Sequence, residues 1–257
     1  MTFSEQIVYG MFKPSKYKEI LELKKGRTVL YVIVLMLVLG IVAFLIPTAA
    51  LITGFGGFEK LFTQKVAPFS FSDGELTIER PFEMTFDYNN ILIDSSVETI
   101  TDNMLEKDGI YYAAGSKTIR LSYVLGRNIY DYQAVELKYL LPEGLDNQMM
   151  CEFIPGIYLF LVLMFLGTCL GFFIKYAIYA LILSICIQSV NKRMELGLSY
   201  GQVFMLCFYG QSFAMVLTNF NMALGLLPTT LVSIVGIFVS IHIITTATLG
   251  MSKTNQV

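Results

Sequence analysis

Residues 28–58 read TVLYVIVLMLVLGIVAFLIPTAALITGFGGF and contain no charged side chain. A helix rises 1.5 Å per residue, so about 20 residues cross the roughly 30 Å hydrocarbon core of a bilayer. This stretch therefore predicts a transmembrane helix at residues 28–53. A signal peptide cleaved after Ala50 is the alternative, but its apolar region is normally only about 7–15 residues long, and we favour the uncleaved helix.

Two further stretches have the same character. Residues 196–252 contain no Asp, Glu, Lys or Arg, and residues 153–190 contain only one of these, Lys175. Charged residues make up 15% of the chain, compared with about 25% in ordinary soluble domains. The sequence thus predicts an integral membrane protein whose α-helical bundle has about four transmembrane helices.

The two C-terminal stretches decide the number of crossings. Residues 153–190 form either one long helix or two helices that reverse near Gly167–Gly171, and we favour one crossing. Residues 196–252 are too long for one span, and the break is expected between Asn219 and Pro228. The expected segments are an amphipathic and basic N-terminal stretch (1–27), a first span (28–53), an inserted β-rich domain (54–152), a second span (153–190), a loop (191–199), a third span (200–218), a loop (219–228), a fourth span (229–250) and a tail (251–257).

Charge is distributed very unevenly along the chain. Residues 1–27 carry six basic and three acidic side chains, whereas residues 59–152 carry 16 acidic and 8 basic ones. Basic residues that flank a span stay in the cytoplasm. We therefore expect a multi-pass protein of the cell membrane with both termini in the cytoplasm and an acidic domain outside. The N-terminal stretch either lies on the inner membrane surface as an amphipathic helix or serves only as the basic flank.

The acidic domain has a β pattern. Asp73-Gly74 predicts a type I′ hairpin that pairs Phe71 with Leu76 and Phe69 with Ile78. A second hairpin is expected around Gly115-Ser116, with a type II′ turn that pairs Tyr112 with Ile119 and Ile110 with Leu121. This second register leaves Tyr111 and Arg120 on the outward face. Residues 90–94 form another expected strand, and residues 128–141 either a pair of strands or a short helix.

Three ionisable residues are candidates for a functional role. Lys175 and His242 lie inside apolar stretches, where ionisable groups are costly and often belong to a substrate or proton path. The structural alternatives are a lysine that reaches the headgroups and a neutral histidine hydrogen-bonded between helices. Asp94 ends an apolar strand and either binds a ligand or caps a turn. Five amide side chains either line a polar path or hold helices together: Gln188, Gln202, Gln211, Asn219 and Asn221.

The sequence offers few residues for a catalytic or metal site. One histidine cannot build a multi-histidine metal site or a histidine-based nucleophilic arrangement, and the patterns GxxxxGK[ST] and HExxH are missing. We therefore expect that the protein is not an enzyme and uses no cofactor or metal.

Four short motifs together resemble a known family. They are FKPSKY (12–17), GRTVLY (26–31), FSFSDGEL (69–76) and ILIDS (91–95). In this order, with one span between the second and third motif and a helical bundle after the fourth, the chain is similar to a bacterial family of uncharacterised polytopic membrane proteins. Some members of that family carry the label maltodextrin-utilisation protein. The resemblance implies a cell-membrane protein linked to carbohydrate uptake, and it supplies no catalytic residues.

Two functions remain open from the sequence. The first is a non-enzymatic accessory or sensor protein that contacts the lipid bilayer and another membrane protein or a further copy of itself. The second is a subunit of an oligomeric transporter or channel, although the sequence shows no pair of broken helices, the usual sign of such a protein. No nucleic-acid partner is expected.

Overall fold

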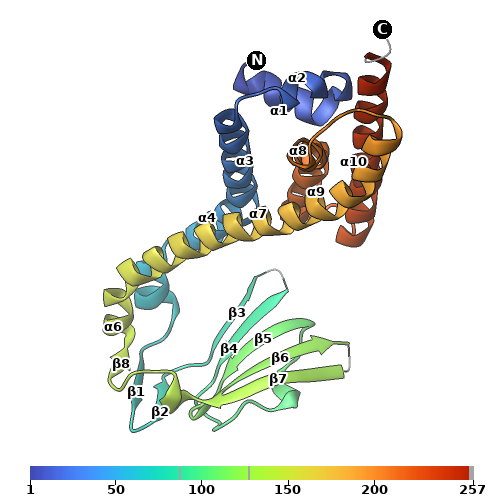
Figure 1. Ribbon diagram of the computed structural model, residues 1–257. Coiled ribbons are helices and arrows are strands. Elements are labelled where there is room, and N and C mark those ends of the chain that lie inside the picture. The colour runs from blue at the N-terminus through green and yellow to red at the C-terminus, as the bar shows by residue number, and fades with distance from the viewer. Residues whose placement is uncertain (87, 127, 255–257) are drawn as a thin grey trace. The chain divides into compact units, whose positions relative to one another are not determined.

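The computed structural model describes residues 1–86, 88–126 and 128–254 (Figure 1). The chain divides into two compact units, a helical unit formed by Met1–Thr48 with Leu161–Val257 and a β-rich unit formed by Ala49–Phe160. Four helical stretches are long and apolar enough to cross a membrane: Gly26–Phe55, Ile154–Arg193, Tyr200–Asn221 and Thr229–Ser252. The prediction of four such helices with an inserted β-rich region is confirmed.

The first and second of these stretches are continuous helices. The first consists of α3 (Lys25–Gly40), a π-helical turn (Ile41–Leu45) and α4 (Ile46–Phe55). The second is α7, which runs from Ile154 to Arg193 without a turn at Gly167–Gly171. Its 40 residues extend about 60 Å. The favoured single crossing agrees with this uninterrupted helix.

The third apolar stretch is interrupted in its middle. α8 (Tyr200–Gly210) and α9 (Ser212–Leu224) are separate helices with Gln211 between them, a break that no sequence pattern predicts. α9 continues through Asn219 and ends at Gly225, whose φ of 62° suits a glycine at a helix C-terminus. α10 (Thr229–Thr254) follows after Pro228. The predicted break between the third and fourth helices therefore begins later than Asn219.

The N-terminal stretch folds back onto the helical unit. It forms α1 (Phe3–Phe12), a short 3-10 turn (Pro14–Lys16) and α2 (Tyr17–Leu21), and Figure 1 shows these helices at one end of the bundle. Tyr17 is fully buried, and its ring packs edge-on against Tyr209 of α8 with 6.5 Å between centroids. The Gln6 amide donates a hydrogen bond to the Tyr209 hydroxyl. One face of this stretch thus packs on protein and not on lipid.

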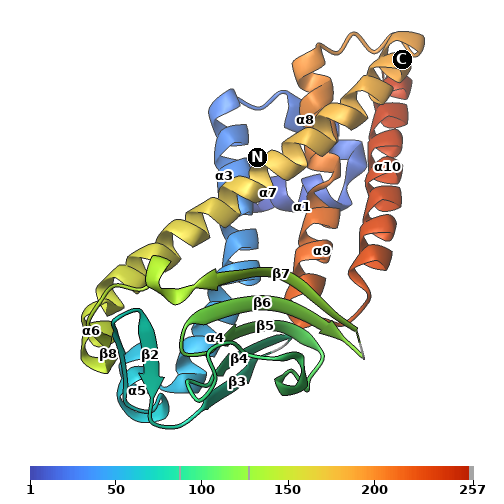
Figure 2. The same cartoon turned by 90° about the horizontal axis from the view of Figure 1, so that it is seen from below.

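The β-rich unit holds two sheets, which Figure 2 shows from below. The smaller has the order β2-β1-β8 and the larger the order β3-β4-β5-β6-β7. The strands are β1 (Phe69–Ser72), β2 (Glu75–Ile78), β3 (Phe82–Phe86), β4 (Asn89–Ile93), β5 (Gly109–Ala114), β6 (Thr118–Leu125), β7 (Asn128–Glu136) and β8 (Leu145–Asp146). Two short helices, α5 (Phe58–Lys60) and α6 (Asn147–Glu152), flank the strands in sequence. Residues 128–136 form the single strand β7, and not the pair of strands or the short helix expected for residues 128–141.

The first hairpin has the predicted register. Phe71 pairs with Leu76 and Phe69 with Ile78, on either side of a turn in which Asp73 and Gly74 both have positive φ. The prediction is confirmed because a two-residue I′ turn fixes the pairing of its strands by itself.

The second hairpin differs from the prediction by two residues. Tyr112 pairs with Leu121, and the last pair before the turn is Ala114 with Ile119. Gly115 does not have the positive φ that a type II′ turn needs. The loop is instead held from outside the hairpin, because the Ser116 N–H donates to the Val97 carbonyl at 2.8 Å and the Lys117 N–H to that of Glu98 at 3.1 Å. The predicted II′ turn and its register are wrong.

The predicted outward position of Tyr111 and Arg120 is also wrong. Both side chains are buried, with 4% and 8% of their surface exposed. β4 and β5 are parallel neighbours, so residues 94–108 must cross over the sheet between them. This crossover covers the face that carries Tyr111, and its Ile100 and Leu105 form a core with that residue.

Arg120 of β6 connects the crossover to the edge strand β7. Its guanidinium donates to both carboxylate oxygens of Asp131 at 2.7 Å, to Asp102 at 2.5 Å and to the Ile100 carbonyl at 3.1 Å. A hydrogen bond from the Ser122 hydroxyl, together with Arg120, lowers the pKa of the Asp131 carboxyl below its usual value of 3.8. The buried arginine thus holds a carboxylate of β7 and one of the crossover.

The lowered pKa of Asp131 predicts a specific sensitivity to acid. Because the folded-state pKa lies below the unfolded-state value, the charged carboxylate stabilises the fold above about pH 4, and this contribution is lost as the pH falls through the folded-state pKa. In melting curves recorded between pH 6 and pH 3, D131N is expected to lose less stability on acidification than the wild type. S122A, which removes the hydrogen bond from the Ser122 hydroxyl to Asp131, is also expected to lose less stability on acidification than the wild type. An unchanged acid dependence in D131N would contradict the assignment.

Candidate ligand site in the helical bundle

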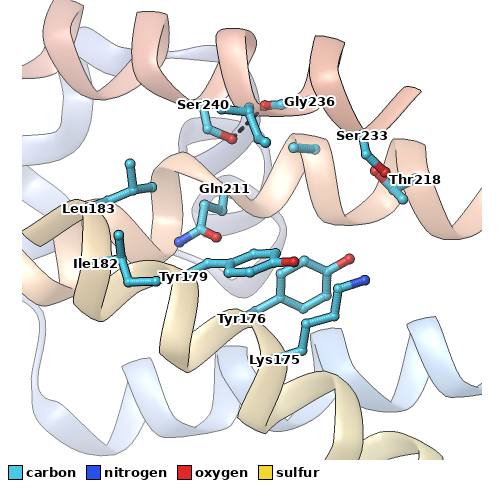
Figure 3. Close-up of a pocket in the computed structure, with 12 residues that line it drawn as sticks. Lys175, Tyr176, Tyr179, Ile182, Leu183, Gln211, Thr218, Ser233, Gly236 and Ser240 are labelled. Carbon is cyan, nitrogen blue, oxygen red and sulfur yellow. Dashed lines mark hydrogen bonds between the residues drawn. The ribbon is translucent and has the colours of Figure 1, made fainter. Parts of the chain in front are cut away.

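A cavity of about 240 Å³ lies between α7, α9 and α10 of the helical unit, beside the break at Gln211 (Figure 3). Most of its surface is apolar, and one amide and several hydroxyl groups face it. The lining residues are Lys175, Tyr176, Tyr179, Ile182, Leu183, Gln211, Ala214, Thr218, Ser233, Gly236, Ile237 and Ser240. Such a mixture of apolar walls and a few converging polar groups is typical of small-molecule sites.

Small residues open this space. α9 and α10 approach closely where Gly236 faces Ala214, since a Cβ added at Gly236 would lie 3.1 Å from the Ala214 Cβ. Close approach over glycine and alanine is the usual way in which membrane helices pack. The neighbouring Ser233, Thr218 and Ser240 are too small to fill the volume between these helices and α7. The cavity is therefore a consequence of the sequence of α9 and α10.

Gln211 lies at the centre of the site. Only 4% of its surface is exposed, and its amide nitrogen donates to the Cys207 carbonyl at 3.1 Å. Its side-chain oxygen accepts no hydrogen bond from any described residue. Figure 3 shows Gln211 between the side chains of α7 and those of α10. A buried amide with a free acceptor at a helix break is well placed to bind a donor group of a ligand.

The α7 side of the cavity is built around Tyr176. This residue is 5% exposed, and its hydroxyl accepts a hydrogen bond of 2.9 Å from the Asn219 amide of α9. The Lys175 ammonium lies 5.3 Å from the centre of the Tyr176 ring, a cation–π distance. Lys175 itself is exposed, so a positive charge stands at the edge of the cavity and not inside it.

The hydroxyl groups on α10 are held by their own helix. The Ser240 hydroxyl donates to the Gly236 carbonyl one turn earlier at 2.8 Å, as the dashed line in Figure 3 shows. Its oxygen retains lone pairs that can accept a further hydrogen bond. Figure 3 also shows Ser233 close to Thr218, which places two hydroxyl groups at the same end of the site.

The three candidate residues from the sequence lie in three different environments. Lys175 lines the cavity, whereas His242 lies on an exposed face of α10 and does not line it. Asp94 belongs to the β-rich unit and accepts a hydrogen bond of 2.9 Å from the Ser96 N–H, the geometry of a turn cap. It also borders a cavity of about 310 Å³ together with Glu106 and Lys107.

Several residues that line the cavity could not be predicted from the sequence as members of a site. Tyr176, Ser233 and Ser240 are ordinary residues in membrane helices, and only the packing of α7, α9 and α10 around the cavity brings them together. One signal was present, because Tyr176, Ala180 and Ser184 recur at four-residue spacing and all three are buried. Such a stripe marks the face of α7 that turns toward other helices. Within the described residues, no group of three or more His, Cys, Asp and Glu could hold a metal ion.

Comparison with known proteins gives one match. A family model described as "Protein of unknown function (DUF1189)" matches residues 5–250, nearly the whole chain. This finding confirms the uncharacterised family that the sequence motifs indicated. No curated protein and no solved structure matches the chain.

Proposed function

Because the chain belongs to the DUF1189 family of proteins of unknown function, we propose its role from its own residues: a non-enzymatic accessory or sensor protein of the cell membrane. In this proposal the cavity beside Gln211 binds an amphipathic molecule. The observation that carries the proposal is the free acceptor of the buried Gln211 amide, which faces an otherwise largely apolar cavity. The four long apolar helices suit the lipid bilayer in which such a ligand dissolves.

The lining residues indicate the kind of ligand. Ile182, Leu183 and Ile237 suit an apolar tail, while Gln211 and the hydroxyl of Ser240 suit hydroxyl or amide groups. The Lys175 ammonium at the edge favours a head group with a negative charge. A lipid-like molecule with a hydroxyl-bearing, anionic head fits these features together.

Binding without chemistry is the simplest use of this site. Apart from Lys175 at the edge, its polar groups are the Gln211 amide and several hydroxyls, of which that of Ser240 is held by the backbone of its own helix and that of Tyr176 by Asn219. Groups fixed in this way orient a ligand and do not exchange protons near neutral pH. Turnover of a bound ligand by purified protein in proteoliposomes would contradict the proposal.

Ligand retention can be measured by native mass spectrometry of the protein released from its own membranes. Q211L, which removes the amide while keeping an apolar side chain of similar length, is expected to reduce the retained ligand about fivefold to tenfold. Q188L is the matched control, since Gln188 is a half-buried amide of α7 that does not line the cavity. Equal retention by the wild type, Q211L and Q188L would exclude ligand binding at this site.

A transporter or channel subunit is the second candidate, and one observation favours it. The third apolar stretch is broken at Gln211, and the first contains a π-helical turn at Ile41–Leu45. Transporters often place substrates at discontinuous helices of this kind. Flux of an anionic solute through proteoliposomes, lost in Q211L and kept in Q188L, would support this role over simple binding.

The orientation and the ligand of the β-rich unit belong to the same proposal. Basic residues at 1–27 and the acidic balance of residues 59–152 favour cytoplasmic termini and an extracytoplasmic β-rich unit. A phosphatase reporter inserted after Gly126 should then be active only outside the cytoplasm, and an inactive reporter in an inserted protein would reverse the assignment. Because related proteins are labelled for maltodextrin use, maltodextrins are the first ligands to test on this unit by thermal shift.

A further inference from the structure

α10 carries a stripe of exposed side chains along one face. The stripe consists of Leu231, Val235, Phe238, His242, Thr245 and Leu249. These positions are separated alternately by four and three residues, the 3.5-residue period of a seam between two supercoiled helices. The side chain of Phe238 is 68% exposed, so the stripe is a surface and not part of the bundle core.

His242 lies in the middle of this stripe and near the middle of α10 (Thr229–Thr254). No described residue forms a hydrogen bond with its ring. A neutral imidazole carries one donor and one acceptor nitrogen, and leaving both unpaired in hydrocarbon costs several kcal/mol. Ionisable residues within membrane helices therefore almost always face protein or water. A helix face in contact with lipid alone would not carry an imidazole ring near the middle of the span.

We propose that this stripe, residues 231–249 of α10, is the contact surface between two copies of the chain in the membrane. Two copies inserted with the same topology have parallel α10 helices, related by a two-fold axis along the membrane normal. That axis places His242 opposite the same residue of the second copy at the same depth. One ring then donates and the other accepts, so the surface is complementary to itself. A lipid tail offers no such partner.

The neighbouring residues suit the same arrangement. Thr245 lies one turn from His242 in the stripe, and its small side chain lets two helices approach closely. A single polar pair in an apolar seam also fixes the register of the two helices. The cavity beside Gln211 uses Gly236 and Ser240, which are not members of the stripe, so dimer formation and ligand retention can fail independently.

Disulfide crosslinking in native membranes tests the contact. The four native cysteines are first replaced by alanine, and T245C and I185C are compared under mild oxidation. Ile185 is 67% exposed but lies on α7, outside the stripe. T245C is expected to form a dimer of twice the chain mass and I185C to remain a monomer. An uncrosslinked T245C in inserted protein, crosslinking of both variants, or crosslinking of T245C only to a protein of different mass would overturn the proposal.

A second measurement separates the His242 pair from general packing. H242L keeps the apolar stripe and is expected to raise the dissociation constant of the dimer about threefold to tenfold, as measured by dilution in detergent micelles. H242N retains a donor and an acceptor and is expected to stay close to the wild type. Equal dissociation constants for H242L and the wild type would show that the histidine does not hold the contact and would overturn the inference.

Discussion

Replacing Arg120 with alanine is expected to lower the free energy of unfolding of the β-rich unit by about 2–4 kcal/mol. The guanidinium holds Asp131 with two hydrogen bonds, Asp102 with one and the Ile100 carbonyl with one. Removing it detaches the crossover from the sheet and leaves that carbonyl without its donor. Because the two carboxylates are more than half exposed, water replaces part of the loss. The effect therefore stays below the upper limit for a fully buried pair.

Hydrogen exchange of the full-length protein in detergent measures this loss at the amides of β5 and β6, and the melting temperature should fall by about 10 °C or more. K117A is the matched control. Lys117 also contacts two carboxylates, those of Glu98 at 2.5 Å and Glu75 at 3.3 Å, but its side chain is 43% exposed. Such solvent-exposed pairs contribute little to stability. Equal losses in R120A and K117A would show that burial of the arginine is not the cause.

Replacing Tyr17 with alanine is expected to destabilise the helical unit by about 3–5 kcal/mol, the usual loss for a buried aromatic ring. Tyr17 is fully buried, its hydroxyl donates to the Gly10 carbonyl at 2.6 Å, and its ring packs on Tyr209. Without this ring the contact between α2 and α8 opens, and the N-terminal helices lose their main anchor on the bundle.

Limited trypsin digestion gives the readout, since Lys16 and Lys18 lie in the segment that should become accessible. The expected result is rapid cleavage of Y17A in detergent under conditions that leave the wild type intact. F12A is the control from the same segment, because Phe12 is 61% exposed and loses only its ring contact with Phe213. A wild-type cleavage rate in Y17A would mean that this ring does not hold the N-terminal stretch.

The two hairpins show how far a local pattern can predict a register. At Asp73-Gly74 the turn sequence and the alternation of side chains agree, and the Glu143 carboxylate, which accepts from both turn N–H groups, leaves the register unchanged. At Gly115 the loop is held by carbonyl groups of residues 97–98, which belong to a crossover with no strong pattern of its own. A register fixed by distant backbone contacts cannot be derived from the turn residues alone.

The ligand site shows a similar limit. Gln211 stood out as an amide in an apolar stretch, but an amide that holds helices together has the same sequence signature as one that binds a ligand. Its free acceptor depends on the break between α8 and α9 and on the small residues of α10. His242 was expected either in a path or between helices, and its exposed position follows from which face of α10 packs on α9.

The sequence by itself determined the four apolar helices, the inserted β-rich region and the first hairpin. Hydrocarbon tolerates almost no charge, so long uncharged stretches are sufficient to specify helices in a bilayer. Only the tertiary structure decided the break at Gln211, the cavity beside it, the burial of Arg120 and the docking of the N-terminal helices. These features depend on which side chains meet across elements far apart in the chain, and no local period or turn encodes those contacts.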